Sequence, residues 1–327
     1  MSKPLVSVWV ASYFAGDYMS ETLDSILMQE TDYPYEIVIG DDCSQDNTWD
    51  VVCEYAKKYP DIIRAHRNEV NLGLSANVLA TKRRCRGKYI VNLSGDDYWI
   101  DPGKIQKQAD FLENHPDYIG VGSKVEIRYG DNKTADAFYP VAEELGKDFT
   151  KDSYSRGVNL PSHGFMVHNI FADPEKQDFI SKVYGVSSAI DDLYDPIIYL
   201  EFGKIYIMEE ATCVYRTQVS KKGRRNFNSS RKTLDKALMI LDGYVKLEQL
   251  QIPGIDLLAR FVSVLNLVML NAFTTGNFRA VGQAYRQIPA KYKTPWYKGV
   301  AWRSFCSVWR TGYWFIKSRF KRLFKNK

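Results

Sequence analysis

Short apolar runs alternate with segments of helical spacing through the first 120 residues of this chain. The runs are rich in Val, Ile and Leu, which is typical of buried strands. The expected strands are residues 5–10, 36–40, 62–65 and 89–93, and the expected helices are residues 17–28, 46–59, 75–84 and 104–114. This alternation predicts an α/β fold, in which a mainly parallel sheet carries helices on both faces.

The pattern becomes less regular after residue 118 and is helical after residue 228. The later expectations are a strand at 165–167, a helix at 191–202, a strand at 204–208, and helices at 229–250, 257–273, 278–287 and 302–327. The most apolar of these segments, residues 261–273, is shorter than the ~20 residues that a membrane span needs. We expect an α/β domain over residues 1–220 and a helical C-terminal region over residues 221–327.

Charge is unevenly distributed along the chain. Residues 290–327 hold eleven Lys or Arg and no acidic residue, which leaves 33 basic against 39 acidic residues elsewhere. The five cysteines show neither CxxC nor Cys/His ligand spacing, so no disulfide framework or zinc site is predicted. The first four residues lead into a strand without the apolar stretch of a signal peptide, which predicts a cytoplasmic protein.

Two adjacent carboxylates, Asp96 and Asp97, follow the expected strand at 89–93. Neighbouring like charges raise the pKa of one group unless a cation compensates them, and a divalent metal would do so. An isolated Asp-Asp pair is more often a polar loop. Here, however, residues 11–14, 41–48 and 71–74 also follow expected strands. In a parallel sheet these loops meet at one edge, outside the carboxyl ends of the strands, where ligands bind.

The loops and their flanking segments resemble the family 2 glycosyltransferases, nucleotide-sugar-dependent enzymes of the GT-A fold. The matching segments are residues 6–13, 21–29, 36–48, 71–73, 87–90, 93–99 and 215–216. The resemblance covers about residues 4–217. It implies a nucleotide-sugar half at about 1–118 and an acceptor half at about 119–220.

The resemblance assigns donor-binding roles to three residues near the amino terminus. It places Ser12 and Tyr13 near the base and ribose, and Asp41 at the imino group of a pyrimidine base. A UDP-sugar is therefore the expected donor.

Asp96 and Asp97 resemble the DxD motif, which binds the ribose and a Mn²⁺ or Mg²⁺ ion that bridges the diphosphate. Ser94 stands where many relatives carry the first Asp of the motif. Which of the two carboxylates binds the metal therefore stays open. A hard cation held by carboxylates would neutralise the charge that develops on the leaving diphosphate.

A second acidic pair, Asp191 and Asp192, heads the expected helix at 191–202. Relatives carry the catalytic base at this place, and the resemblance implies direct displacement with inversion. Spacing back from Gly203 favours Asp192 as the base over Asp191. The alternative is that one carboxylate caps the helix and the other interacts with its dipole.

Two histidines and one glutamine receive no catalytic role. His163 and His168 bracket the expected strand at 165–167, and a histidine in such a place is more often structural. Gln218 stands where many relatives have the His of a Tyr-Arg-x-His segment, and an amide is a weaker metal ligand. The Gln-x-x-Arg-Trp signature of processive relatives is absent, which predicts transfer of one sugar per visit.

The basic tail has an aromatic stripe at three- and four-residue steps. Its members are Trp302, Phe305, Trp309, Tyr313, Ile316, Phe320 and Leu323. A basic amphipathic helix rich in Trp and Phe predicts in-plane binding to an anionic membrane through residues 296–327. The alternative is a helix docked on the catalytic domain. Because no nucleic-acid-binding module accompanies the charge, nucleic acid is not an expected partner.

The sequence thus predicts a metal-assisted, inverting, hexosyltransferase-type enzyme that is peripheral on the inner face of the cytoplasmic membrane. Its acceptor would be a hydroxyl of a glycan or lipid-linked precursor in surface polysaccharide synthesis. A nucleotidyltransferase is an alternative, but residues 11–17 contain only Gly16 where such an enzyme has a glycine-rich phosphate loop. An inactive sugar-nucleotide-binding scaffold is the other alternative.

Overall fold

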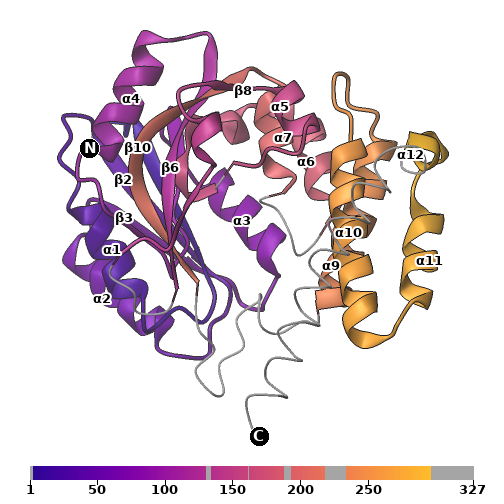
Figure 1. The fold of residues 1–327 in the computed structure, drawn as a ribbon. Helices are drawn as coiled ribbons and strands as arrows, with labels where there is room; N and C mark the ends of the chain where they lie inside the picture. Colours follow the sequence, from indigo (N-terminus) through magenta and orange to yellow (C-terminus); the bar gives the residue numbers. More distant parts are fainter. Residues whose placement is uncertain (1–2, 130–133, 161, 188–192, 218–232, 296–327) are drawn as a thin grey trace, which may run out of the picture. The chain divides into compact units, whose positions relative to one another are not determined.

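The computed structural model of the chain describes residues 3–129, 134–160, 162–187, 193–217 and 233–295. Internal contacts divide the chain into two units. The first comprises residues 1–154 and 158–226, and the second comprises residues 155–157 and 227–327. The first unit is a mixed α/β structure and the second is helical (Figure 1).

A single mixed sheet forms the centre of the first unit, in the strand order β3-β2-β1-β4-β9-β6-β10-β5. The strands β1, β2, β3 and β4 are parallel, and so are β6 and β10. Only β9 separates these two groups, and it is antiparallel to both β4 and β6. The bounds are β1 Val6–Ser12, β2 Tyr35–Asp41, β3 Ile63–Arg67, β4 Tyr89–Asn92, β5 Tyr98–Trp99, β6 Tyr118–Tyr129, β9 Met166–His168 and β10 Lys204–Thr217. Two short strands, β7 (Ala137–Tyr139) and β8 (Asp148–Phe149), pair with β6 and β10.

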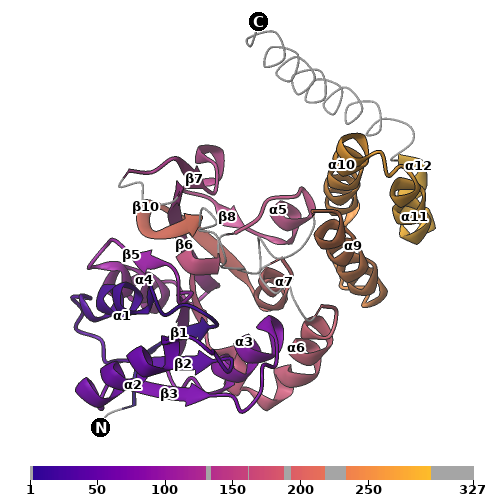
Figure 2. The same cartoon turned by 90° about the horizontal axis from the view of Figure 1, so that it is seen from below.

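Helices cover both faces of this sheet (Figures 1 and 2). One face carries α1 (Met19–Leu27), α2 (Thr48–Lys58) and α4 (Lys104–Asn114), and the other carries α3 (Leu74–Arg83), α6 (Gln177–Tyr184) and α7 (Asp195–Leu200). A further short helix, α5, spans Lys151–Ser155. The predicted fold class is confirmed, and the strands and helices expected before residue 118 are all present within a few residues of their expected bounds.

The core of the first unit explains why its sequence pattern was readable. The five residues from Val6 to Val10 in β1 are all buried, and so are the six from Glu36 to Asp41 in β2. Helix α3 packs so closely on β2 that a Cβ atom on Gly40 would lie 2.0 Å from Thr81 Oγ1. A strand buried on both faces has a continuous apolar run in place of an alternating one.

Strand β10 is longer than the sequence pattern predicts. It runs from Lys204 to Thr217, whereas the apolar alternation ends at residue 208. Its pairing with β6 shifts register between Ile207 and Ala211, and the exposed Glu209 and Glu210 occupy this irregularity. A bulge breaks the two-residue period, so the sequence pattern ends where the strand continues.

The second unit is built from α9 (Thr233–Gln249), α10 (Leu258–Thr275), α11 (Arg279–Gln287) and α12 (Ala290–Pro295). The Phe261 ring on α10 lies 5.1 Å from the Tyr292 ring, whose hydroxyl donates to Glu248 Oε2 at 2.7 Å. Helix α10 ends at Gly276, which has the left-handed backbone conformation of a helix C-cap (φ 76°). Within the described parts of the chain, none of the helices has the length and apolar character that crossing a bilayer requires.

Candidate active site

The loops after β1 and β2 are joined by three hydrogen bonds at the carboxyl edge of the sheet. The backbone N–H of Phe14 donates to Ser44 Oγ at 3.1 Å, and that of Ala15 donates to Thr48 Oγ1 at 2.9 Å. The Gly16 N–H donates to Asp46 Oδ2 at 3.2 Å. These contacts fix the backbone of residues 14–16 ahead of α1, which begins at residue 19 and not at the predicted residue 17.

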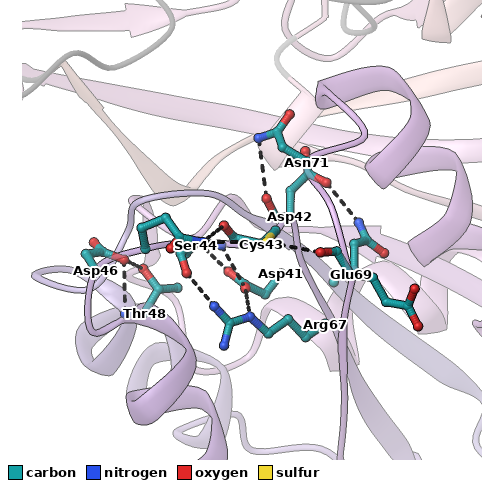
Figure 3. A network of polar contacts seen from close by, with 12 residues as sticks. Asp41, Asp42, Cys43, Ser44, Asp46, Thr48, Arg67, Glu69 and Asn71 are labelled. Atoms are coloured by element: carbon teal, nitrogen blue, oxygen red, sulfur yellow. Dashed lines mark hydrogen bonds and ion pairs between the residues drawn. The ribbon is translucent and has the colours of Figure 1, made fainter.

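Asp41 lies at the centre of a buried polar network in the loop after β2 (Figure 3). Its carboxylate accepts hydrogen bonds from the backbone N–H and the hydroxyl of Ser44, and it lies 3.4 Å from Arg67 Nε. Arg67 also donates to the Ser44 carbonyl at 2.6 Å. Burial raises the pKa of Asp41, and the hydrogen bonds from Ser44 act against that rise. The carboxylate shapes the loop, and its contact with a pyrimidine base stays a prediction.

Asp42 orders the loop after β3 by accepting hydrogen bonds from it. The sequence prediction gave Asp42 no such role. Its side chain accepts from the backbone N–H groups of Leu72 (2.8 Å) and Gly73 (2.9 Å) and from Asn68 Nδ2 (2.9 Å). The side chain of Asn71 completes the network by donating to the Asp42 carbonyl (Figure 3). The adjacent carboxylates at 41 and 42 therefore order two different loops.

An exposed aromatic pair and a buried hydroxyl line the end of β1. The rings of Tyr13 and Phe14 are 52% and 46% exposed and meet edge to face with centroids 4.6 Å apart. Phe14 has a positive φ of 55°, which is a strained conformation for a bulky residue and is held by the hydrogen bond to Ser44. Ser12 Oγ is buried and has no hydrogen-bond partner among the described residues. A nucleoside has a flat base that can pack on the Tyr13 or Phe14 ring and polar atoms that can hydrogen-bond with Ser12 Oγ.

The acidic turn, residues 94–97, places its two carboxylates in different surroundings. Asp97 is 1% exposed; its Oδ1 accepts the backbone N–H of Arg216 at 2.7 Å, and its Oδ2 lies 2.9 Å from His163 Nε2. Asp96 is only partly buried. Its pKa is raised to about 7, first by burial and then by the charge of Asp97, while His163 and Arg216 act in the opposite direction.

The backbone of the acidic turn is held by α1. Thr22 Oγ1 lies 3.1 Å from the Gly95 carbonyl and 2.7 Å from the Asp97 carbonyl and donates to them. A Cβ atom on Gly95 would lie 3.2 Å from Ser12 Oγ, so the turn and the end of β1 are neighbours. The structure therefore brings Ser12, Tyr13, Asp96 and Asp97 to one edge, with the Asp41 loop beside them.

His163 is the site residue to which the sequence interpretation gave no role. Its Nε2 atom lies 2.7 Å from Ser94 Oγ, and its ring stacks on Tyr215 with centroids 5.6 Å apart. The only signal in the sequence was its place at the start of the expected strand at 165–167. His168, the last residue of β9, contacts the ring of Tyr89.

A divalent cation fits the acidic turn. In the described part of the chain, His163 Nε2 lies 2.9 Å from the buried Asp97 Oδ2. The pKa of Asp96 is raised first by burial and then by the charge of Asp97, and a bound cation would oppose both effects. Among the described residues no three His, Cys, Asp or Glu side chains are grouped as a metal cage. Two carboxylates that leave the other positions to water and phosphate oxygens are the donor set that Mg²⁺ and Mn²⁺ take at nucleotide sites.

Three predicted features lie outside the described residues. These are the acidic pair Asp191 and Asp192, the segment 218–232 with Gln218 and its basic loop, and the tail at 296–327. The chain directly after the acidic pair is described: the Tyr154 hydroxyl donates to the Leu193 carbonyl at 2.9 Å. The assignment of the base stays a prediction.

Residues 7–166 match the sequence profile of Glycosyl transferase family 2. This segment is a family 2 glycosyltransferase domain. The domain is 38% identical over 109 residues to the Escherichia coli enzyme WfaP, a UDP-Glc:alpha-D-GlcNAc-diphosphoundecaprenol beta-1,3-glucosyltransferase. That match covers 33% of this chain and 41% of WfaP. The chain spans about half the length of the curated relatives it matches.

Two solved glycosyltransferase structures share the fold of the chain. S. aureus TarS 1-349, in complex with UDP-GlcNAc, has a TM-score of 0.58 at 16% identity, with 88% of this chain and 82% of TarS covered. Mannosyltransferase PcManGT from Pyrobaculum calidifontis, in complex with GDP-Man and Mn²⁺, has a TM-score of 0.55 at 17% identity, with 96% and 88% covered. These similarities show that the family 2 domain has the GT-A fold.

Proposed function

We propose that this chain transfers a sugar from a nucleoside-diphosphate donor to a hydroxyl of a glycan or lipid-linked acceptor, with inversion at the anomeric carbon. The observation that carries the proposal is the acidic turn at the carboxyl edge of the sheet. There Asp96 and Asp97 lie beside the Ser12 hydroxyl, which has no hydrogen-bond partner in the part of the chain that the structure describes, in a domain of a family whose members transfer sugars. A site that holds surplus negative charge and an unused polar atom suits a cation-bound diphosphate.

The described residues divide the binding of the donor between them. The exposed ring of Tyr13 offers a face for the base, and Ser12 Oγ offers a hydrogen bond to the nucleoside. The loop ordered by Asp41 borders this position. Solved neighbours bind UDP-GlcNAc and GDP-Man, so both uridine and guanosine donors are to be tested, with UDP-sugars as our first expectation.

Asp96 and Asp97 would hold the divalent cation, Mn²⁺ or Mg²⁺. When bound, the cation neutralises charge on the leaving diphosphate. The Asp97 carboxylate accepts the Arg216 N–H and lies 2.9 Å from His163 Nε2. Asp96 is the more exposed of the two carboxylates. We therefore assign Asp96 to the side of the turn that faces the donor, and Asp97 to the side that faces the protein.

The acceptor hydroxyl loses its proton as it attacks the anomeric carbon, and a carboxylate can accept that proton. We assign this task to Asp192, with Asp191 as the alternative. The Tyr154 contact to the Leu193 carbonyl anchors the chain one residue after this position.

Nucleotide release tests the proposal. Purified protein is incubated with UDP-sugars and GDP-sugars and Mn²⁺, with and without EDTA, and with and without acceptor. We expect EDTA, Asp96→Asn and Asp97→Asn each to abolish release, and Asp178→Asn, an exposed carboxylate on α6, to leave it unchanged. Full activity in EDTA would remove the metal from the proposal. If Asp191→Asn and Asp192→Asn both keep acceptor-dependent turnover, the assignment of the base is wrong.

The proposed setting is surface polysaccharide synthesis at the inner face of the cytoplasmic membrane. Its support is the similarity to WfaP, whose name describes a diphosphoundecaprenol acceptor, together with the basic aromatic tail. Each Lys or Arg near an anionic surface contributes roughly 1 kcal/mol. Co-sedimentation with anionic liposomes should therefore require residues 296–327. A chain ending at Pro295 keeps the packing of Tyr292 on Phe261, and equal pelleting of the two proteins would refute the membrane role.

A further inference from the structure

We propose that His163 is a positioning residue for the acidic turn: from the loop before β9 it holds Ser94 and Asp97 in the geometry that binds the sugar donor. This inference rests on the proposed function. It assigns a role to a side chain that lies 69 residues from Ser94 in the sequence. The supporting observations concern the ring, its backbone and its neighbours on β10.

The His163 ring contacts both ends of the acidic turn. Nε2 hydrogen-bonds with Ser94 Oγ at 2.7 Å and lies at ion-pair distance, 2.9 Å, from Asp97 Oδ2. The other carboxylate oxygen of Asp97 is already taken by the Arg216 N–H. Both oxygens of Asp97 are therefore placed by groups from outside the turn, and Asp96 is left as the more exposed carboxylate.

The backbone that carries His163 is held by an unusual number of buried groups. The carbonyl of Gly164 accepts from Lys104 Nζ (3.1 Å), Gln108 Nε2 (2.8 Å) and Ser123 Oγ (3.0 Å). A Cβ atom on Gly164 would lie 2.7 Å from the Ser123 carbonyl, so only glycine fits this close approach.

Of the three side chains that donate hydrogen bonds to the Gly164 carbonyl, Lys104 is the most costly to bury. Its side chain is fully buried, and burial lowers the pKa of its ammonium group to about 8. Placing a lysine in the core is costly. Its ammonium group also donates to Gln108 Oε1 (2.9 Å) and Thr212 Oγ1 (3.1 Å), so a buried polar network holds the peptide group next to His163.

Strand β10 supports the same arrangement from the other side. Tyr215 stacks on the His163 ring at an interplanar angle of 28°, and the next residue, Arg216, supplies the N–H that binds Asp97. Cys213 Sγ lies 3.3 Å from the His163 carbonyl and donates to it. Rigid support from neighbouring elements is what holds a functional side chain within the tolerance that binding needs.

Binding of nucleotide in the presence of metal tests the role of His163 without relying on turnover. UDP and GDP, each with Mn²⁺, are titrated by calorimetry into the full chain and into His163→Ala, His163→Asn and His163→Gln. A glutamine amide nitrogen reaches about as far as histidine Nε2, whereas the asparagine amide stops short. We expect Ala and Asn to weaken binding about 10-fold or more, as for loss of a hydrogen bond to a charged group, and Gln to recover most of the loss.

His168, five residues after His163 and on β9 itself, provides the control. Its ring contacts Tyr89, so His168→Ala also removes a packed imidazole and should change nucleotide affinity less than about 2-fold. Melting of each variant without ligand separates loss of fold from loss of binding.

Two results would overturn this inference. The first is a folded His163→Ala or His163→Asn variant that binds the nucleotide as tightly as the unmodified chain. The second is a His163→Gln variant that binds no better than His163→Asn. If the unmodified chain itself binds neither UDP nor GDP with Mn²⁺, the proposed function fails and this inference fails with it.

Discussion

Removing the ammonium group of Lys82 should destabilise the first unit more than any change to a surface charge. Lys82 is fully buried on α3, and its Nζ contacts Asp195 Oδ2 at 2.6 Å, the Tyr184 hydroxyl at 2.9 Å and the Tyr199 hydroxyl at 3.1 Å. The three donors of the ammonium group are thus all used. The Tyr184 hydroxyl in turn donates to Asp195 Oδ1 at 2.8 Å.

The structure sets the size of the effect. Lys82→Met keeps most of the side-chain volume but leaves the carboxylate of Asp195, 5% exposed, without its cation. Breaking a buried ion pair from one side costs about 3–5 kcal/mol, since an uncompensated charge remains inside the protein. A loss of about 4 kcal/mol is a large share of the ~5–15 kcal/mol that stabilises a typical domain.

Urea unfolding followed by tryptophan fluorescence measures this loss. The matched control is Lys182→Met on α6, which breaks an exposed pair whose Lys182 and Asp178 side chains are 59% and 79% exposed. We expect the control to cost at most about 0.5 kcal/mol. The double variant Lys82→Met/Asp195→Leu should be more stable than Lys82→Met alone, because it removes the stranded charge.

The reasoning about the buried pair would be refuted by either of two measurements. One is a Lys82→Met variant that loses no more stability than Lys182→Met. The other is a double variant whose loss equals the sum of the two single losses, which would show that Lys82 and Asp195 do not act as a pair.

Three further predictions concern residues at or near the carboxyl edge of the sheet. In metal-free protein the pKa of Asp96 is about 7, against an ordinary 3.8, so the folded state keeps a proton that the unfolded state has lost. The free energy of unfolding should therefore fall as pH rises from about 4 to about 7, and Asp96→Asn should remove that slope; a slope that persists in the variant contradicts the assignment. Asp42→Ala removes the acceptor of the Leu72 N–H and leaves Asn71 Oδ1 as the acceptor of the Gly73 N–H, so it should cost about 1–3 kcal/mol. Faster hydrogen exchange at Leu72 is the measurement that checks it. Gly40→Ala places a Cβ atom 2.0 Å from Thr81 Oγ1 and should cost about 1–3 kcal/mol, part of which Thr81→Ala should restore; no restoration would argue against overpacking as the cause.

The fold of the first 118 residues was predictable because its signals are local. Strands β1, β2 and β4 are buried almost throughout, whereas the edge strand β3 buries only Ile63, and each helix between them presents a periodic apolar face. Helix α4 has the predicted bounds, Lys104–Asn114, since Pro102 and Gly103 precede it and Pro116 follows it. Local chemistry of this kind marks where elements begin and end.

The later part of the first unit was less predictable because its structure depends on partners distant in sequence. Strand β10 continues past a bulge because β6 is beside it, and no local pattern records that pairing. The short strand β9 is correctly placed at about 165–167, yet its antiparallel position between β4 and β6 follows only from the assembled sheet.

The sequence by itself determined the class of fold, the edge where the loops meet and the acidic pair Asp96–Asp97, because short buried runs and strand-end carboxylates are local features. Only the tertiary structure decided that Asp97 faces the protein, that His163 holds it, and that Lys82 pairs with Asp195 across 113 residues. The electrostatic partner of a side chain depends on how segments that are distant in sequence pack together. The number of residues between two side chains does not predict how far apart they lie in space.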